Sequence, residues 1–566
     1  KEYRRQRQMC IRDRNYEPDV TQLLGLYQQL EDDIVADMVR RMLRMGFVSE
    51  TTAYQAEVLQ TAGILYDDIL QMIADRTDVS VAQVRAMFED AGVRTVEIDN
   101  DTHEAAGEAP ADIRQDGGMK QVLDAGYRKT LGTMRNLVST TANTTQTAFL
   151  QVCDRAYMQL SSGAFSYQDA IRMAVRNLAD GGAYVTYPTG HRDRIDVAVR
   201  RCVLTGVGQT AAAVAKKRAE DSGCRYMELT AHGGARPEHA RWQGQLVQIQ
   251  GKRTRKVIDG LKVFTLQEIG YGDGRGFKGW NCRHNWHPYY PGLSTPNYTP
   301  EQIARLDEKS ISYNGEKYTA YEISQMQRKG ERKVRTLKRR AAALEEAAKN
   351  TDDPVLKQGL NDDFSAVSVR LKDAEKTLKD FCQQTGQRRD AFREQVNGFG
   401  RSTAQRAVHQ NNLAFQESMR KKGFQNPPKS LAKMEKMQYN DPKEYALMKS
   451  YEKSVDTGMM SPLVGYEKYK EYHQRVETEL VGLKTNGGVV IRSQSKHFLE
   501  RVFGTISDPS HSGVKREGVE LEDVKEALEH GKVKKHPSRD SMTFATDKCI
   551  VSVNTKTGNL IQVTPQ

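Results

Sequence analysis

The 566-residue sequence contains no uninterrupted apolar run of the roughly 18 to 20 residues that a membrane-spanning helix needs. Its first residues also lack the basic, apolar and small-residue order of a secretory signal. These absences exclude an integral membrane protein and make export by the usual signal route unexpected. Hydrophobic residues make up only 38% of the chain and charged residues 28%. This balance indicates several modules with much exposed helix rather than one large enzyme core.

Cysteine is also scarce, with seven residues scattered from Cys10 to Cys549. An odd number at irregular spacing excludes a disulfide framework and favours a reducing compartment. The net charge of +12 is mild over this length. Half of the excess lies between Arg328 and Lys349, where nine basic residues stand against three acidic ones in one helical stretch.

The start of the chain differs in character from the rest. Residues 5–14 read RQRQMCIRDR, which resembles a translated sequencing adapter. We expect residues 1–14 to be a non-native artefact, and the alternative is a native basic arm.

Hydrophobic periodicity predicts a multidomain α+β protein. Apolar residues such as Leu23, Leu30 and Ile34 recur at three- and four-residue steps, which is typical of an amphipathic helix, and Ser80 is expected to cap a later helix. The period changes to that of strands near the middle of the chain. The predicted parts are an N-terminal helical region (15–110), an α+β core with a small irregular sheet (111–300), a long helical region with basic helices (301–413), a linker with short helices (414–488) and a small C-terminal α+β module (489–566).

The densest group of metal-ligand residues lies in the predicted core. His232, His239, Cys282, His284 and His287 stand near a glycine-rich segment and all three tryptophans. Histidine and cysteine are ligands that zinc prefers, and four of them in a tetrahedron would form a structural site that staples a small sheet. The alternatives are plain packing against the tryptophans and a catalytic Cys282–histidine pair, for which no orienting carboxylate stands out. Structural zinc is the candidate cofactor, and no other is predicted.

The glycine-rich segment GYGDGRGFKG (270–279) has two interpretations. Its backbone amides could wrap a phosphate, but it lacks the ending of a P-loop and does not open a helix. We therefore expect its glycines to permit tight turns where the loop approaches the sheet.

Four motifs follow one another along the chain: TAHGGARPEHARWQGQ, EIGYGDGRGFKGWNCRHNWHPYYPG, YTAYEISQMQRKGERKVRTLKRR and DFCQQTGQRRDAFREQVNGFGRS. In this series the chain resembles the tailed-phage minor capsid protein family of the minor capsid 2 type, which is related to the phage Mu F-like head morphogenesis proteins. The similarity covers residues 18–415. The positions that match the family's motif are His232, Arg236, Pro237, His239, Gly244, Gly270, Gly272, Gly279, Asn281, Cys282, Arg283 and His284.

The resemblance implies a bacteriophage virion protein, present in few copies near the portal vertex, that acts in head assembly or DNA ejection. The portal protein, other capsid proteins and packaged phage DNA are its expected partners, without a membrane anchor. Its expected location is the capsid interior or the portal vertex, with a stage in the host cytoplasm during assembly or after ejection. The resemblance does not imply an enzyme.

The basic stretch adds a physical reason for DNA as a partner. A helix with charge on several faces cannot bury them, so it must lie in water or against a polyanion such as packaged DNA, bound through its phosphates. The alternative is a solvated helix supported by i,i+4 pairs such as Glu331 with Arg335. The candidate nucleic-acid contacts are Arg328, Arg332, Lys333, Arg335, Lys338, Arg339 and Arg340.

The C-terminal module is the other candidate place for chemistry. SKHFLERV (495–502), an acidic helix and closing strands around the turn NTKTGN resemble the small phage nucleases of the barnase, EndoU, colicin and RelE-like group. Metal-independent RNA cleavage needs a general base, a general acid and a cation near the phosphate, and His497 and Arg501 share a helix face. The alternative is a small docking domain in which His497 packs or caps. The candidate catalytic residues are His497, Arg501, His536, Arg539, Ser541 and Thr555.

Taken together, these patterns predict a phage minor capsid and head morphogenesis protein with a C-terminal RNase-like effector domain that acts on host RNA. Enzymatic activity is expected, if anywhere, in that module alone. The alternative is a polymorphic ribonuclease toxin delivered with phage DNA, in which the preceding residues form a delivery platform.

Overall fold

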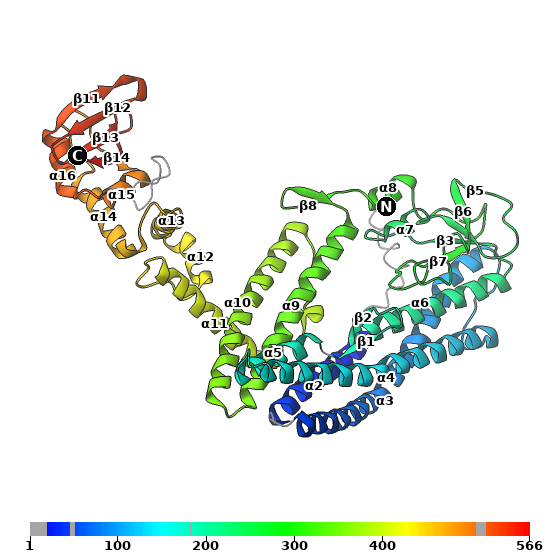
Figure 1. The fold of residues 1–566 in the computed structure, drawn as a ribbon. Helices are drawn as coiled ribbons and strands as arrows, with labels where there is room; N and C mark the ends of the chain where they lie inside the picture. The colour runs from blue at the N-terminus through cyan, green and yellow to red at the C-terminus, as the bar shows by residue number, and fades with distance from the viewer. Residues whose placement is uncertain (1–19, 46–50, 182, 505–516) are drawn as a thin grey trace. The chain divides into compact units, whose positions relative to one another are not determined.

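A computed structural model describes residues 20–45, 51–181, 183–504 and 517–566. The chain divides into two compact units, residues 1–407 and 408–566 (Figure 1). The first combines long helices with a small sheet, and the second combines shorter helices with another sheet. The predicted multidomain α+β class with a helical N-terminal region is therefore confirmed. Residues 1–14, the predicted artefact, lie outside the described residues.

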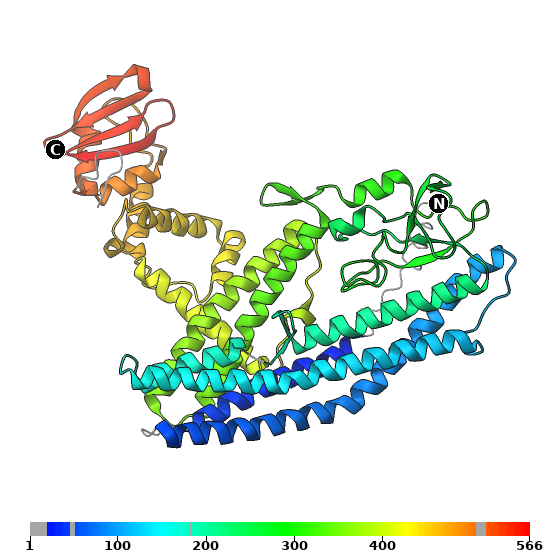
Figure 2. The ribbon, with the colours of Figure 1, turned by 45° about the vertical axis from the view of Figure 1, so that its right-hand side comes forward.

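Long helices make up the N-terminal region, and α3, α4 and α6 lie side by side along much of their length (Figure 2). No helix in the described ranges joins the length and the apolar character that a bilayer crossing requires. The bounds are α2 (Thr21–Met45), α3 (Thr51–Ala105), α4 (Gly117–Ser161), α5 (Tyr167–Gly181) and α6 (Ile195–Asp221).

The predicted helix start at Ser80 is wrong, because α3 runs unbroken past it. The Ser80 hydroxyl donates to the Arg76 carbonyl oxygen one turn earlier, at 2.6 Å, and the residue is fully buried. A serine inside a helix can satisfy its hydroxyl in this way without capping anything.

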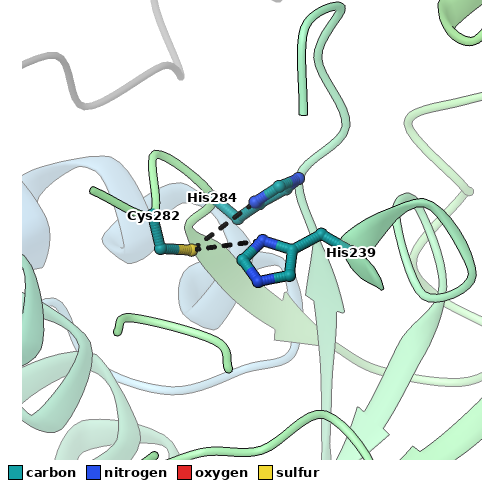
Figure 3. Close-up of side chains that lie close together, drawn as sticks. All are labelled: His239, Cys282 and His284. Carbon is teal, nitrogen blue, oxygen red and sulfur yellow. Dashed lines mark hydrogen bonds between the residues drawn. The ribbon is translucent and has the colours of Figure 1, made fainter. Parts of the chain in front are cut away.

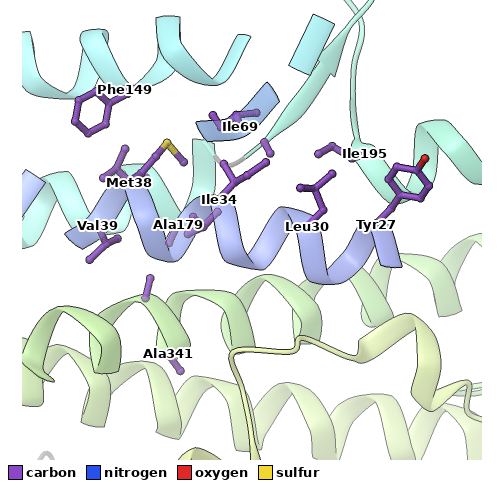
Figure 4. Packing of buried hydrophobic residues seen from close by; sticks show 14 of the residues in the cluster. Tyr27, Leu30, Ile34, Met38, Val39, Ile69, Phe149, Ala179, Ile195 and Ala341 are labelled. Atoms are coloured by element: carbon purple, nitrogen blue, oxygen red, sulfur yellow. The ribbon is translucent and has the colours of Figure 1, made fainter. Parts of the chain in front are cut away.

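Helix α2 is enclosed by its neighbours, including the later helix α9 (Ala320–Lys349). Leu30, Ile34 and Met38 are fully buried and face side chains such as Phe149 of α4 (Figure 4). Burying each such side chain contributes about 1.5–3 kcal/mol. The predicted apolar stripe is the core-facing side of this helix.

A five-stranded mixed sheet follows α6 in the first unit. Its strand order is β5-β6-β4-β3-β7; β4 and β6 are parallel and the other neighbours are antiparallel. Small residues of α6, such as Ala212 and Ala215, pack with Leu229 and Trp286 of the sheet. The bounds are β3 (Tyr226–Leu229), β4 (Leu246–Gln248), β5 (Val257–Ile258), β6 (Leu261–Thr265) and β7 (Trp286–Tyr289).

Helices α9 and α10 (Pro354–Thr385) form an antiparallel hairpin. Thr319 starts α9 with a capping box, because its hydroxyl accepts from the Glu322 amide while the Glu322 side chain accepts from the Thr319 amide. The remaining elements of this unit are β1 (Tyr184–Thr186), β2 (Arg192–Arg194), α7 (Pro237–Ala240), α8 (Pro300–Leu306), β8 (Ile311–Tyr313), β9 (Glu316–Tyr318) and η2 (Ala391–Glu394).

The second unit ends in a five-stranded sheet of order β10-β14-β13-β12-β11. Strands β10 and β14 are parallel, and the other pairs are antiparallel. The bounds are α11 (Arg401–Lys421), α12 (Leu431–Asn440), α13 (Pro442–Asp456), η3 (Pro462–Val464), α14 (Tyr466–Glu479), β10 (Ser493–Gln494), α15 (Lys496–Val502), α16 (Leu521–His530), β11 (Lys532–His536), η5 (Pro537–Arg539), β12 (Ser541–Ala545), β13 (Cys549–Asn554) and β14 (Asn559–Pro565).

One hydrophobic cluster runs through this unit. Met434 and Tyr451, from the segment predicted as a linker, share it with Phe498 and Val551 of the C-terminal module. The helices of 414–488 are thus packed elements. The finer division of the chain into six parts stays a prediction.

Candidate metal centre and its cavity

The candidate metal centre lies at one end of the sheet of the first unit. Strands β3 and β7 are antiparallel, with Leu229 paired to Trp286. The segment that leaves β3 and the segment that enters β7 therefore lie at the same end of the sheet. The first carries His239 and the second carries Cys282 and His284, so strand pairing brings together residues that are far apart in the sequence.

Three of the five predicted ligands converge there (Figure 3). Cys282 Sγ lies 3.5 Å from Nδ1 of His284 and 3.9 Å from Nδ1 of His239. One ligand atom from each residue lies within 4.8 Å of the other two, and both histidines are buried while Cys282 is half-buried. A closed structural zinc site uses four protein ligands, whereas three leave a fourth position open.

The outer nitrogens of both rings have their own partners. His239 Nε2 lies 2.8 Å from the Arg275 carbonyl oxygen, and His284 Nε2 lies 3.0 Å from Gln243 Oε1. Gln243 Oε1 also accepts from the backbone amide of His232 at 3.0 Å, which identifies it as the acceptor end of the amide. Each Nε2 therefore donates, and each Nδ1 directs a lone pair toward the sulfur. Such outer hydrogen bonds orient histidine ligands in metal sites.

The surroundings keep these rings neutral. Burial lowers the pKa of His284 well below its usual value, and the nearby His232 and His239 lower it further. Burial also lowers the pKa of His239, although its hydrogen bond to the Arg275 carbonyl acts in the opposite direction. Neutral imidazole is the form that binds a metal, so protons compete weakly here. Donor type, tautomer and charge all fit a borderline-soft ion such as zinc.

The other two predicted ligands lie outside this set. The His232 ring lies beside His284, tilted by 33° with 4.3 Å between ring centroids, but its Nδ1 lies 3.1 Å from the Gly233 carbonyl oxygen. His287 is buried on the α3 side of the sheet, with Nδ1 3.0 Å from Asp99 Oδ1. His287 lies within β7 and pairs with Asp99 of α3, whereas the cluster lies beyond the end of that strand.

The glycine-rich loop closes on itself so tightly that a side chain would collide with backbone. A Cβ at Gly276 would lie 2.0 Å from the Gly270 carbonyl oxygen, and one at Gly279 would lie 2.4 Å from that of Gly274. These glycines therefore permit close turns, as the second interpretation predicted. The closed loop presents the Arg275 carbonyl to His239.

The cluster opens onto a cavity of about 620 Å³. Its walls come from the His232–His239 and Trp280–His284 segments, the start of α9 and residues 387–393. Most of its lining is polar or charged, and its large aromatic side chains among the described residues are Trp280, 54% exposed, and the half-buried Tyr321.

The motifs that build this cluster and cavity also match known proteins. The sequence profile of the family described as phage minor capsid protein 2 matches residues 11–383, well over half of the chain. The chain belongs to the phage minor capsid protein 2 family. The predicted resemblance is thereby confirmed, and family membership makes this a phage structural protein.

Two curated relatives of this family member are also phage structural proteins. A structural protein of Lactococcus phage LL-H is 24% identical over 311 residues, which are 52% of this chain and 78% of that protein. A structural protein of Lactococcus phage mv4 is 38% identical over 84 residues, 15% of this chain and 59% of that protein. No solved structure matches the chain.

The basic helix α9 of this minor capsid protein buries part of its charge. The prediction that a helix with charge on several faces cannot bury them is therefore wrong. Arg335 and Arg339 are buried, with Arg335 Nη1 2.7 Å from Asp196 Oδ2 and Arg339 Nη2 2.9 Å from Glu31 Oε2. Glu331, suggested above as an i,i+4 partner of Arg335, instead forms an ion pair with Arg393 at 3.6 Å. Acidic residues of neighbouring helices supply the compensation that burial of a guanidinium requires.

Two further members of the predicted DNA-binding set contact acidic side chains. Arg340 Nε lies 2.6 Å from Asp180 Oδ1, and Lys338 Nζ lies 3.7 Å from Glu375 Oε1. Arg332 and Lys333 are exposed, and Arg328 lines the cavity. A nucleic-acid contact stays a prediction, and these last three residues are the members positioned for one.

The six predicted catalytic residues fall into two groups. His497 and Arg501 touch on α15, with 3.4 Å between His497 Nε2 and Arg501 Nε, and His497 Nδ1 lies 3.4 Å from Glu500 Oε2. His536 pairs with Ser541 across β11 and β12, near Arg539 and Thr555. Strand β11 and the β10–α15 segment lie at opposite edges of the sheet, four strand spacings or about 19 Å apart. The structure does not join the groups into one site.

Sequence reasoning missed the residues that support the cluster. Gln243 orients His284, and Arg236 and Arg388 line the cavity. Glutamine is not a usual zinc ligand and Arg388 lies outside the basic block, so neither was singled out, whereas Arg236 stands among the positions that match the family's motif. The available signal was position, because all three stand inside the quoted motifs.

Proposed function

We propose that the protein is a structural component of the phage head, near the portal vertex, and that it acts in head assembly or DNA ejection. The match of the minor capsid family to residues 11–383 carries this proposal. Its partners would be the portal and other capsid proteins, and it would pass through the host cytoplasm during assembly or after ejection. Mass spectrometry of purified particles and cross-linking to the portal protein test it. Absence from purified particles would overturn it.

We propose further that His239, Cys282 and His284 bind zinc, which holds the loops that frame the cavity. The inward Nδ1 atoms and the half-buried thiol support this assignment. When bound, zinc would act as a cross-link between the two loop segments. Zinc content of the full chain is measured for wild type, Cys282→Ser and the matched Cys202→Ser, another half-buried cysteine. Stoichiometric zinc that only Cys282→Ser loses is expected, and sub-stoichiometric zinc unaffected by Cys282→Ser would refute the site.

Packaged DNA is proposed as a non-specific partner of Arg328, Arg332 and Lys333. Contacts to phosphates make binding fall steeply with salt. Duplex binding by the full chain is compared at low and moderate salt for wild type and Arg332→Glu/Lys333→Glu. The control, Lys357→Glu/Arg370→Glu, makes the same charge change on exposed positions of α10. Binding that ignores salt, or that both variants weaken equally, contradicts this contact.

A second candidate function is RNA cleavage by the C-terminal module. The observation in its favour is the contact of an imidazole with a guanidinium and a carboxylate at His497, Arg501 and Glu500, groups that suit metal-independent phosphodiester cleavage. Full-length chains carrying His497→Ala, or His530→Ala as an exposed control, are expressed in bacteria. Wild type and the control should damage cellular RNA and His497→Ala should not; equal growth and intact RNA in all three would end the idea. The alternative of a ribonuclease toxin with a delivery platform gains no support from the curated relatives, both of which are named structural proteins.

A further inference from the structure

The cavity beside the metal cluster carries an excess of positive charge. Among the described residues that line it, six are arginines and one, Asp390, is acidic. Arg201 and Arg393 contact carboxylates. Arg236 instead donates to the carbonyl oxygen of Trp280 at 2.6 Å, and a neutral carbonyl does not compensate the charge of the guanidinium. Cations on concave walls of low dielectric focus a positive potential. The cavity is therefore suited to an anion.

Trp280 gives the same cavity an aromatic surface. The indole is 54% exposed, whereas Trp242 and Trp286 are buried. A Cβ at Gly274 would lie 2.8 Å from its six-membered ring, so the ring packs directly against the glycine loop. The loop thus holds the indole in position while much of its surface stays open. A held, exposed aromatic ring is a platform on which a nucleobase can stack.

Charge and aromatic surface together favour one ligand class. Arginine guanidinium groups bind phosphate through paired N–H donors. An acidic peptide would use the arginines but would not need the indole. The cavity of about 620 Å³ falls in the size range of small-ligand sites. It would admit a single nucleotide but not a base-paired duplex.

We propose that this cavity binds a nucleotide unit, with arginine side chains holding the phosphate and Trp280 stacking on the base. The shared chemistry is a phosphate joined to an aromatic base, and its source is either a nucleic-acid strand or a free nucleotide. A strand would come from the DNA contact proposed above, and to that extent the inference rests on it. The two sites share Arg328, whereas Arg332 and Lys333 of the proposed duplex contact lie outside the cavity lining.

The test is a binding titration of the full-length protein. Fluorescently labelled oligothymidylate and thymidine monophosphate are added separately while intrinsic tryptophan emission is followed. Because Trp280 is the exposed tryptophan, we expect quenching on binding. Trp280→Ala should weaken oligonucleotide binding about tenfold, as loss of one stacking platform does. Arg388→Glu, at an exposed cavity residue, should weaken it similarly without disturbing the loop.

Arg370→Glu is the matched control, with the same charge change on an exposed residue of α10 outside the cavity. It should leave single-strand binding nearly unchanged. Tighter binding of the oligonucleotide than of the monophosphate supports a strand, and equal binding supports a free nucleotide. The proposal is overturned in favour of an acidic peptide if polyglutamate displaces the oligonucleotide and Trp280→Ala leaves oligonucleotide binding unchanged. No binding of either probe also overturns it. If the wild-type protein binds the oligonucleotide but not duplex DNA, the DNA contact on α9 is contradicted and the cavity proposal is not.

Discussion

Arg339 of α9 and Glu31 of α2 form a buried ion pair that joins two helices from distant parts of the first unit. Arg339 Nη2 lies 2.9 Å from Glu31 Oε2, and the two residues are 2% and 0% exposed. Arg194 donates to the other oxygen of Glu31 at 2.7 Å, and Arg335 lies 3.5 Å away. The basic block of α9 therefore serves partly to hold α2 in the core.

Removing one partner of this pair should destabilise the first unit. Arg339→Met keeps an apolar stem but leaves the Glu31 carboxylate with fewer cations, so we expect a loss of about 3 kcal/mol in the free energy of unfolding. Urea denaturation of the full chain measures it. Arg340→Met is the control, because its half-exposed ion pair with Asp180 should contribute less than about 1 kcal/mol. Equal effects of both variants would contradict the assigned role of burial.

Gln243→Leu tests whether the outer hydrogen bond orients the candidate metal ligand. Without the Gln243 acceptor, nothing directs the Nε2 proton of His284 away from the cluster, so the Nδ1 lone pair is no longer fixed. Zinc affinity should fall about 10- to 100-fold, as for other supporting residues. Competition with a chromophoric chelator measures the affinity. Gln245→Leu, two residues away, should bind zinc nearly as wild type does, and an equal loss there would count against this mechanism.

Two glycine substitutions should change stability in opposite directions. In Gly276→Ala the new methyl group would lie 2.0 Å from the Gly270 carbonyl oxygen, so the loop must open and we expect a loss of at least about 2 kcal/mol. In Gly63→Ala, inside α3, nothing lies within 4 Å of the added carbon. That change should stabilise the helix by about 0.5–1 kcal/mol. Thermal denaturation measures the stability of both variants. If Gly276→Ala is stabilised, the loop has room for a methyl group beside the Gly270 carbonyl oxygen.

The stability of the second unit should depend on Glu500 at low pH. Burial alone would raise the pKa of Glu500, but hydrogen bonds from His497, Ser454 and Lys496 lower it to about 2. A carboxylate with a depressed folded-state pKa stabilises the fold above its unfolded value and loses this contribution as pH falls. Stability should therefore decline between about pH 4.5 and pH 2, by about 3 kcal/mol at most.

Calorimetry of the full chain against pH checks this prediction. In Glu500→Gln the transition of the second unit should begin lower at pH 7 and fall less steeply on acidification. Glu529→Gln, at a partly exposed position of α16, is the control and should keep the wild-type slope. A slope unchanged by Glu500→Gln would show that other carboxylates cause the acid sensitivity.

Local features of the fold were readable from the sequence. The spacing of Leu30 and Ile34 predicts the buried side of α2, because 3.6 residues per turn place them on one face. The turn NTKTGN joins β13 to β14, as its residues favour. Ser80 misled because a hydroxyl can bond either a new helix start or the carbonyl one turn earlier. The choice between these partners depends on packing around α3.

The family, the helical and strand periods, and the donors from which a metal site can be built all follow from the order of residues. Folding in three dimensions is needed to bring His239, Cys282 and His284 together and to pair His287 with Asp99. It also buries Arg339 against Glu31. Sequence periodicity carries information only about the helix or strand to which a residue belongs. Ligand geometry and charge compensation depend instead on which distant segments strand pairing and helix packing bring within a few ångströms.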